Sequence, residues 1–167
     1  EPRTAEGLIL DGWYTDENYT SAYDFESAVT ADISLYAVGY TDGLKIANGT
    51  VTGYAGTDET VVIPAVYGGE AVTAIGSSAF MGNHTVVSVV LPDTVTSVGD
   101  YAFYDCEYLE TINLSDGIQS IGKYAFYRNQ RLESFGEIGG VTAIEEGTFL
   151  GCVLISAVKI PEGTRYV

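Results

Sequence analysis

The sequence predicts a solenoid, a fold in which similar short coils stack along one axis. Three observations lead to this prediction: a repeat of 23 residues, apolar columns that keep one phase, and a short strand pattern inside each repeat. Four rows run without a gap over residues 72–94, 95–117, 118–140 and 141–163, and residues 164–167 begin a fifth. Because one coil cannot bury its apolar side alone, stacking makes the buried side continuous.

The columns of this repeat identify the positions that we expect to face inward. The first column is aliphatic in every row: Val72, Val95, Ile118 and Val141. The ninth is always phenylalanine, which predicts an aromatic stack through the core: Phe80, Phe103, Phe126 and Phe149. The twelfth alternates between two small polar types, which we expect to satisfy backbone groups at a tight turn: Asn83, Cys106, Asn129 and Cys152.

Each row also contains one short strand. The spacing of Leu109, Ile112 and Leu114 is typical of a strand whose alternate residues point inward. The fourth row predicts an equivalent strand whose outward residues are Ala157, Lys159 and Pro161. The third row departs from this pattern, because Glu137 stands where the second row has Leu114. A one-residue bulge that turns Ile138 inward would restore the core. The corner at which Ala and Phe recur in successive rows is expected to be a short helical or irregular turn.

The second row fits the pattern L-x-x-I-x-L-x-x-x-I-x-x-I-G-x-x-A-F-x-x-C, which resembles the BspA-like leucine-rich repeats of bacterial surface proteins. The resemblance implies a leucine-rich-repeat solenoid of the α/β class, rich in strands, over residues 72–167. It also implies an extracellular or cell-surface location, with no signal sequence in this chain. Residues 49–76 resemble the hairpin that caps the first coil in that family, so residues 42–71 are expected to form this cap, after a turn at Asp42-Gly43.

Residues 1–41 do not fit the 23-residue grid. They are similar to the second half of the internalin B-repeat (Listeria–Bacteroides repeat) modules, which are small β-grasp-like folds. The matching motifs are Gly12-Trp13-Tyr14-Thr15-Asp16, Tyr23-Asp24-Phe25, Val29-Thr30 and Leu35-Tyr36-Ala37. A partial module exposes strand edges, so this segment must pack on the repeats, pair with another chain or be partly disordered.

Composition excludes several classes of partner. The net charge is −16, from 7 basic and 23 acidic residues, and such a surface repels nucleic acid and anionic lipid. No apolar run approaches the ~20 residues that cross a bilayer, so we expect no direct membrane insertion.

The sequence offers little catalytic or metal-binding chemistry, and we expect a protein that is not an enzyme and uses no cofactor or metal. The only histidine, His84, occupies a variable loop column and reads as a solvated residue. Cys106 and Cys152 are two coils apart, or ~9–10 Å, which exceeds the roughly 7 Å that a disulfide allows; both are expected to be free and buried. An acidic column of Asp93, Asp116 and Glu162 makes an acid-catalysed hydrolase a distant alternative.

Two surfaces remain as candidate binding sites. The outward strand positions are small and mostly uncharged, and tyrosines gather in the two middle rows, where they offer contact area at low entropy cost. Tyr104 and Tyr127 are better explained by packing between coils. The candidate binding residues are Tyr101, Tyr108, Tyr124, Thr111, Asn113, Ser115, Ser134 and Lys159.

The leading hypothesis is an adhesion or ligand-binding module of the bacterial surface. On the resemblance alone, its partner would be a host or bacterial surface protein, a matrix component or a glycan. The alternative is a structural spacer within a longer surface protein.

Overall fold

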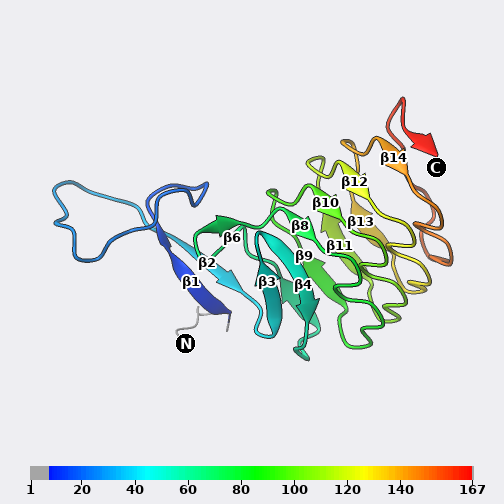
Figure 1. The fold of residues 1–167 in the computed structure, drawn as a ribbon, viewed down its shortest axis with the longest axis horizontal. Helices are drawn as coiled ribbons and strands as arrows, with labels where there is room; N and C mark the ends of the chain where they lie inside the picture. The colour runs from blue at the N-terminus through cyan, green and yellow to red at the C-terminus, as the bar shows by residue number, and fades with distance from the viewer. Residues whose placement is uncertain (1–7, 167) are drawn as a thin grey trace.

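The computed structural model describes residues 8–166 and shows a strand-rich solenoid of about 5 coils, spaced by about 23 residues (Figure 1). The predicted solenoid is therefore confirmed. The described part of the chain contains no helix, so the corners predicted as helical or irregular turns are irregular turns.

Two sheets run along the solenoid, one on each side of the core, and their strands pair in parallel except for the antiparallel pair of β3 and β4 (Figure 1). The longer sheet has the order β15-β14-β12-β10-β8-β4-β3; its strands are Arg165–Tyr166, Ala143–Ile144, Ser120–Ile121, Ser97–Val98, Ala74–Ile75, Thr50–Tyr54 and Leu44–Ala47. The shorter sheet has the order β13-β11-β9-β5; its strands are Ser134–Gly136, Thr111–Leu114, Ser88–Val90 and Thr60–Val62. Within the repeats, paired residues such as Ser97 and Ser120 are one row apart.

The phenylalanine column forms the stack that the sequence predicts. Phe80 and Phe103 have ring centroids 4.9 Å apart, and Phe103 and Phe126 have centroids 5.4 Å apart with nearly parallel rings. Phe149 continues the stack at 5.8 Å but is only partly buried, because it lies in the last full coil. The aliphatic columns complete this single core.

The Asn and Cys column satisfies backbone groups at the corners, as predicted, and from Cys106 onward these groups belong to the preceding coil. The buried Asn129 side chain donates from Nδ2 to the Phe103 carbonyl (3.0 Å) and accepts the Cys106 N–H at Oδ1 (2.9 Å). The Cys106 thiol donates to the Phe80 carbonyl at 3.0 Å and accepts the Asn83 N–H, so the two residue types make the same pair of contacts. We call this contact the intercoil clip, and its members are Cys106, Asn129 and Cys152.

The predicted bulge in the third row is also confirmed. The register between β11 and β13 shifts, Gly136 has a φ of +76°, and Ile138 is buried while Glu137 is exposed.

The strand predicted over residues 157–161 is wrong, because the structure forms no strand there and the shorter sheet stops at β13. The bulge at Gly136 gives a physical reason, since a bulge interrupts the ladder on which the next strand would pair.

Each coil turns its corner through two left-handed residues, at fixed phases. A left-handed conformation costs a non-glycine residue about 1–2 kcal/mol, so the corner must be held by its surroundings. Backbone hydrogen bonds between successive corners provide this hold, for example Tyr101 N–H to the Lys123 carbonyl at 2.9 Å. The two columns are Ser78, Tyr101, Tyr124 and Gly147, and Gly82, Asp105, Arg128 and Gly151.

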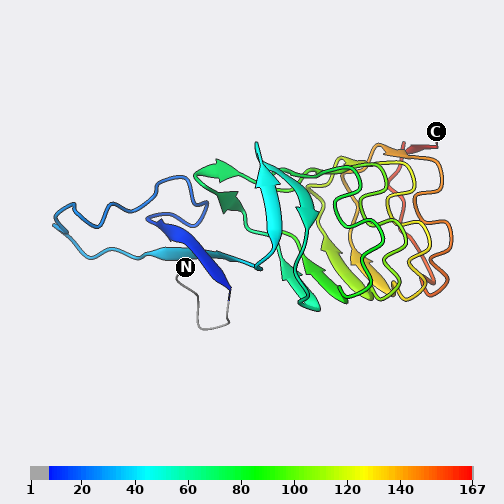
Figure 2. The same ribbon diagram turned by 60° about the horizontal axis from the view of Figure 1, so that its bottom comes forward.

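The N-terminal unit is an antiparallel pair, β1 (Ile9–Tyr14) and β2 (Tyr36–Tyr40), joined by a long connection (Figures 1 and 2). It packs on the small hairpin of β6 (Val66–Tyr67) and β7 (Glu70–Ala71). Of the three arrangements that the sequence leaves open, the structure thus shows the one in which this segment packs on the rest of the chain.

Three contacts hold the N-terminal unit in place. Tyr14, Val38 and Val66 form a second, small core, and the Gly68 N–H donates to the Asp11 carboxylate at 3.1 Å. Thr41, which is buried between the two units, makes two hydrogen bonds with Val62 of β5. Its backbone N–H donates to the Val62 carbonyl, and its hydroxyl oxygen accepts the Val62 N–H.

Candidate interaction surfaces

The outer face of the shorter sheet carries two of the predicted binding residues side by side. Thr111 in β11 and Ser134 in β13 are exposed and directly paired in register, and Ser88 occupies the same position in β9. The Thr111 hydroxyl donates to the Ser88 hydroxyl at 2.9 Å. The face is therefore a flat row of small hydroxyls, which we call the strand face and define by Ser88, Thr111 and Ser134.

Asn113 and Ser115 lie at the end of this face. The Asn113 side chain is exposed, but its Oδ1 accepts the Leu91 N–H at 2.6 Å and its Nδ2 donates to the Leu91 carbonyl at 3.0 Å. It thus substitutes for a strand pair where β9 ends. Ser115 follows β11 and is half-buried.

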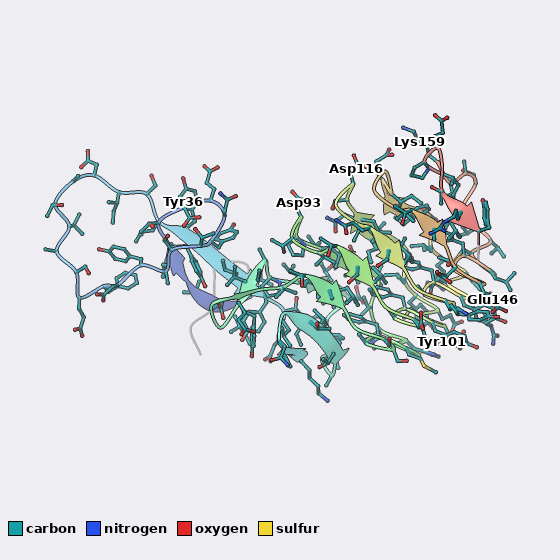
Figure 3. All side chains as sticks on the ribbon, turned by 45° about the horizontal axis from the view of Figure 1, so that its top comes forward. Tyr36, Asp93, Tyr101, Asp116, Glu146 and Lys159 are labelled. Atoms are coloured by element: carbon teal, nitrogen blue, oxygen red, sulfur yellow. The ribbon has the colours of Figure 1, made fainter. Side chains whose placement is uncertain are left out.

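Lys159 lies beside β13, although its own segment forms no strand. It is exposed and lines a groove of about 390 Å³ together with Ser134, Gly136 and Ala157. Lys159 is thus brought next to Ser134, and Figure 3 shows it at the end of the solenoid that lies away from the N-terminal unit.

Four of the tyrosines in the two middle rows pack against one another. Tyr101 stacks on Tyr124 (centroids 5.5 Å apart) and Tyr104 stacks on Tyr127 (4.9 Å). Edge and tilted contacts join the two stacks, so the four rings make one cluster across two coils. Tyr101 is the most open member at 38% exposed. We call these four residues the tyrosine cluster.

Glu146 fixes one ring of this cluster. The Tyr124 hydroxyl donates to the Glu146 carboxylate in a short hydrogen bond, and this bond is the main reason that the Tyr124 pKa rises to about 12. The phenol is therefore held as a neutral donor, and the ring is fixed at a left-handed corner residue.

Tyr108 does not belong to the tyrosine cluster. The Arg131 guanidinium lies 4.6 Å from its ring centroid, in a cation–π contact, and Arg131 also approaches Glu110 at 3.9 Å. The ring is half-buried. The structure therefore brings Tyr101 and Tyr124 together and places Tyr108 apart from both.

Sequence reasoning missed Arg131 and Glu146, which hold two of the three predicted tyrosines. A signal for Arg131 was present, because Tyr108 and Arg131 share one column and columns stack one coil apart. No comparable signal marks Glu146, which lies in the column next to that of Tyr124 and reaches it across the corner.

The residues with reactive side chains are engaged in packing or exposed to solvent. Cys106 and Cys152 are free and buried, as predicted, and burial raises their pKa values to about 12 and about 11. His84 is exposed and lies 3.8 Å from the Glu107 carboxylate. In the part of the chain that the structure describes, no group of three or more His, Cys, Asp or Glu side chains is arranged to hold a metal ion. Residues 8–166 also contain no helix long and apolar enough to cross a membrane.

A stack of 23-residue coils with a parallel strand in each coil defines a leucine-rich repeat protein. The BspA type leucine rich repeat region matches residues 63–167 in 6 copies, and the Listeria-Bacteroides repeat domain matches residues 1–38. Because the first match covers more than half of the chain, the chain belongs to the BspA type leucine rich repeat family.

Solved structures include similar proteins. A leucine rich cell surface protein from Faecalibacterium prausnitzii A2-165 is 31% identical with a TM-score of 0.64, over 76% of this chain and 36% of that one. The chain thus spans about a third of that relative's length. The T. pallidum leucine rich repeat protein is 21% identical (TM-score 0.45, 70% and 77% of the two chains), and one from Bacteroides capillosus ATCC 29799 is 24% identical (0.44, 78% and 87%). No curated protein matches the chain.

Proposed function

We propose that this chain is a non-enzymatic interaction module of a bacterial cell-surface or secreted protein. It binds a host or bacterial surface protein, a matrix component or a glycan through the strand face, and the tyrosine cluster provides a second contact area. Family membership supports an interaction or scaffold role, and the Faecalibacterium relative is described as a cell surface protein.

The observation that carries this proposal is the absence of charge on the strand face of a protein with net charge −16. The described positions Ser88, Thr111 and Ser134 bear only hydroxyls, while Glu110 and Glu133 stand immediately before the strands. Uncharged surfaces lose less hydration energy than charged ones when a partner covers them, and charged residues are depleted at the centres of interfaces.

A structural spacer is the second candidate function, and one observation favours it. The polar groups at this face already bond within the protein, Thr111 with Ser88 and Asn113 with Leu91. Groups that are satisfied internally have less to gain from a partner.

A pair of matched substitutions separates the two functions. Ser134→Arg places a long charged side chain on the strand face, and Ser120→Arg places the same side chain on the exposed strand of the opposite sheet in the same row. Both are tested in a binding screen against matrix proteins, mucin and glycans, with far-UV circular dichroism as the folding control.

The interaction function predicts one saturable ligand whose affinity falls at least about tenfold in Ser134→Arg and is unchanged in Ser120→Arg. Polar substitution of Tyr101 is expected to weaken the second contact area, with far-UV circular dichroism again as the folding control. If no ligand binds, or if Ser134→Arg and Ser120→Arg bind the ligand with the same affinity, the spacer function replaces the interaction function.

A further inference from the structure

A cleft of about 510 Å³ lies where the N-terminal unit meets the first coil. One wall comes from residues 17–19 and from β2, and the other from residues 62–65 and 92–94. Figure 3 shows Tyr36 on the N-terminal unit and Asp93 on the end of the repeat region nearest to it. Clefts of this volume at the junction of two structural units are typical ligand sites.

Among the described residues, the two walls carry acidic groups and no basic ones. Glu17 lines one wall and Asp93 the other, and no lysine, arginine or histidine of residues 8–166 is among the lining residues. Within residues 8–166 the Asp93 carboxylate has no hydrogen bond or ion pair, and Glu17 accepts only the Tyr36 hydroxyl, at 3.2 Å. Two carboxylates that face one cleft without a cation favour a positively charged ligand, and the net charge of −16 steers cations toward the surface.

Apart from Asn18 and Thr94, the rest of the lining is made of apolar residues, tyrosine and glycine. Val38 and Pro64 are buried, and Tyr19 packs edge-on against Tyr14 with ring centroids 5.7 Å apart. Tyr19 is held in a left-handed conformation with φ of +57°. A lysine or arginine side chain matches such a lining, because its stem is apolar and its head is charged.

The backbone of β2 also borders the cleft. In the described part of the chain β2 pairs only with β1, so its other edge is not covered by a strand. Three consecutive residues, Ala37, Val38 and Gly39, line the cleft, as expected where the edge of a strand and not one of its faces forms the wall. A strand edge can accept an extended peptide through main-chain hydrogen bonds.

We propose that this cleft binds an extended segment of a partner protein that carries lysine or arginine. The basic head lies between Glu17 and Asp93, its stem rests on Tyr19 and Pro64, and the backbone of the segment pairs with Ala37 to Gly39 of β2, which border the cleft. This site is separate from the strand face, so it stands or falls independently of the proposed function.

The chain provides its own reporter for this site. Trp13 is the only tryptophan, is 39% exposed and pairs with Ala37, which lines the cleft. Its fluorescence is titrated with an acetylated and amidated pentapeptide that alternates lysine and threonine. The matched probe has glutamine in place of each lysine.

Three variants of the full chain locate the binding. Glu17→Gln and Asp93→Asn each remove one carboxylate from the cleft and keep a hydrogen-bond acceptor. Glu162→Gln makes the same charge change in the Asp93 column, at an exposed position outside the cleft. We expect saturable binding of the lysine peptide, weakened about threefold to tenfold by either cleft variant and unchanged by Glu162→Gln.

Several results would overturn the proposal. Equal weakening by all three variants would mean diffuse attraction to an acidic surface. Equal binding of the glutamine peptide would mean that the charge is not recognised, and no saturable change with the lysine peptide would mean that the cleft does not bind it. If an oligosaccharide panel shows a glycan that binds and is lost in the two cleft variants while the lysine peptide does not bind, the cleft is a glycan site.

Discussion

The intercoil clip allows a sharp test of what holds the coils together. Asn129→Ala removes the side chain that bridges two coils. Because Asn129 is 0% exposed, water does not reach the site to replace the lost hydrogen bonds. The variant leaves the Phe103 carbonyl and the Cys106 N–H without their partners at 3.0 and 2.9 Å.

The expected loss follows from these two backbone groups. A buried polar group that loses its only partner costs about 1–3 kcal/mol, so the free energy of unfolding should fall by about 2–6 kcal/mol. A domain of this size has about 5–15 kcal/mol in total, so the loss is a large fraction of it.

The chain itself supplies the matched control. Cys106 and Cys152 make the clip with a thiol at the same phase: each sulfur donates to a carbonyl at 3.0 Å and accepts a backbone N–H from the previous coil. Asn129→Cys should therefore keep most of the stability, within about 1–2 kcal/mol of the wild type, because a thiol makes weaker hydrogen bonds than an amide.

Equilibrium urea unfolding followed by far-UV circular dichroism measures both variants. Trp13 fluorescence, recorded in the same samples, reports on the N-terminal unit and shows whether that unit unfolds with the coils. The reasoning is refuted if Asn129→Ala unfolds within about 0.5 kcal/mol of the wild type, or if Asn129→Cys is as unstable as Asn129→Ala.

Three further predictions concern single groups. The two buried thiols, with pKa values raised to about 12 and about 11, should resist a thiol reagent in the native protein at about pH 8 and react in urea. Rapid reaction of the native protein would contradict this prediction. Because the unfolded thiols ionise near their ordinary pKa of 9 and the folded ones do not, the free energy of unfolding should fall as the pH rises above 9. Glu146→Gln should lower the Tyr124 pKa from about 12 toward 10, measured by phenolate absorbance, whereas an unchanged titration curve would mean that the carboxylate is not the cause. Gly136→Ala should lower the free energy of unfolding by at least about 2 kcal/mol, because its Cβ would lie 2.2 Å from a carbonyl oxygen of β11. The control is Gly68→Ala, which is also at positive φ but has open space around it and should cost only about 1 kcal/mol. Equal losses of the two variants in urea unfolding would argue against the steric cause.

Much of the repeat region could be predicted because its contacts are periodic. Once the 23-residue row is known, residues in one column are neighbours, so the phenylalanine stack follows from the sequence. The sequence also predicts that the Asn and Cys column satisfies backbone groups, but not that these groups lie in the preceding coil. The bulge that turns Ile138 inward followed from the same logic, because a buried Glu137 would be too costly. The prediction of a strand over residues 157–161 was wrong because it assumes that the ladder continues regularly from row to row, and the bulge at Gly136 breaks that ladder.

The remaining features depend on contacts that are not periodic. The N-terminal unit packs through Tyr14 and Val66 and through Asp11 and Gly68, pairs of residues more than 50 positions apart with no shared phase. The cleft at that junction could not be found for the same reason. The candidate tyrosines were recognised by type, but which of them cluster depended on ring directions at left-handed corners, which composition does not specify.

The irregular end of the shorter sheet has a consequence for how these molecules behave in a crowd. An open strand edge is a template on which other chains can pair, and repeated pairing leads to aggregation. At β13 the segment that contains Lys159 lies beside the edge without pairing to it, and the strand itself carries a left-handed glycine followed by the exposed Glu137. Bulges, charged side chains and covering loops are the means by which natural sheets block such pairing. The irregularity that deprives this sheet of a further strand therefore also keeps neighbouring molecules from extending it.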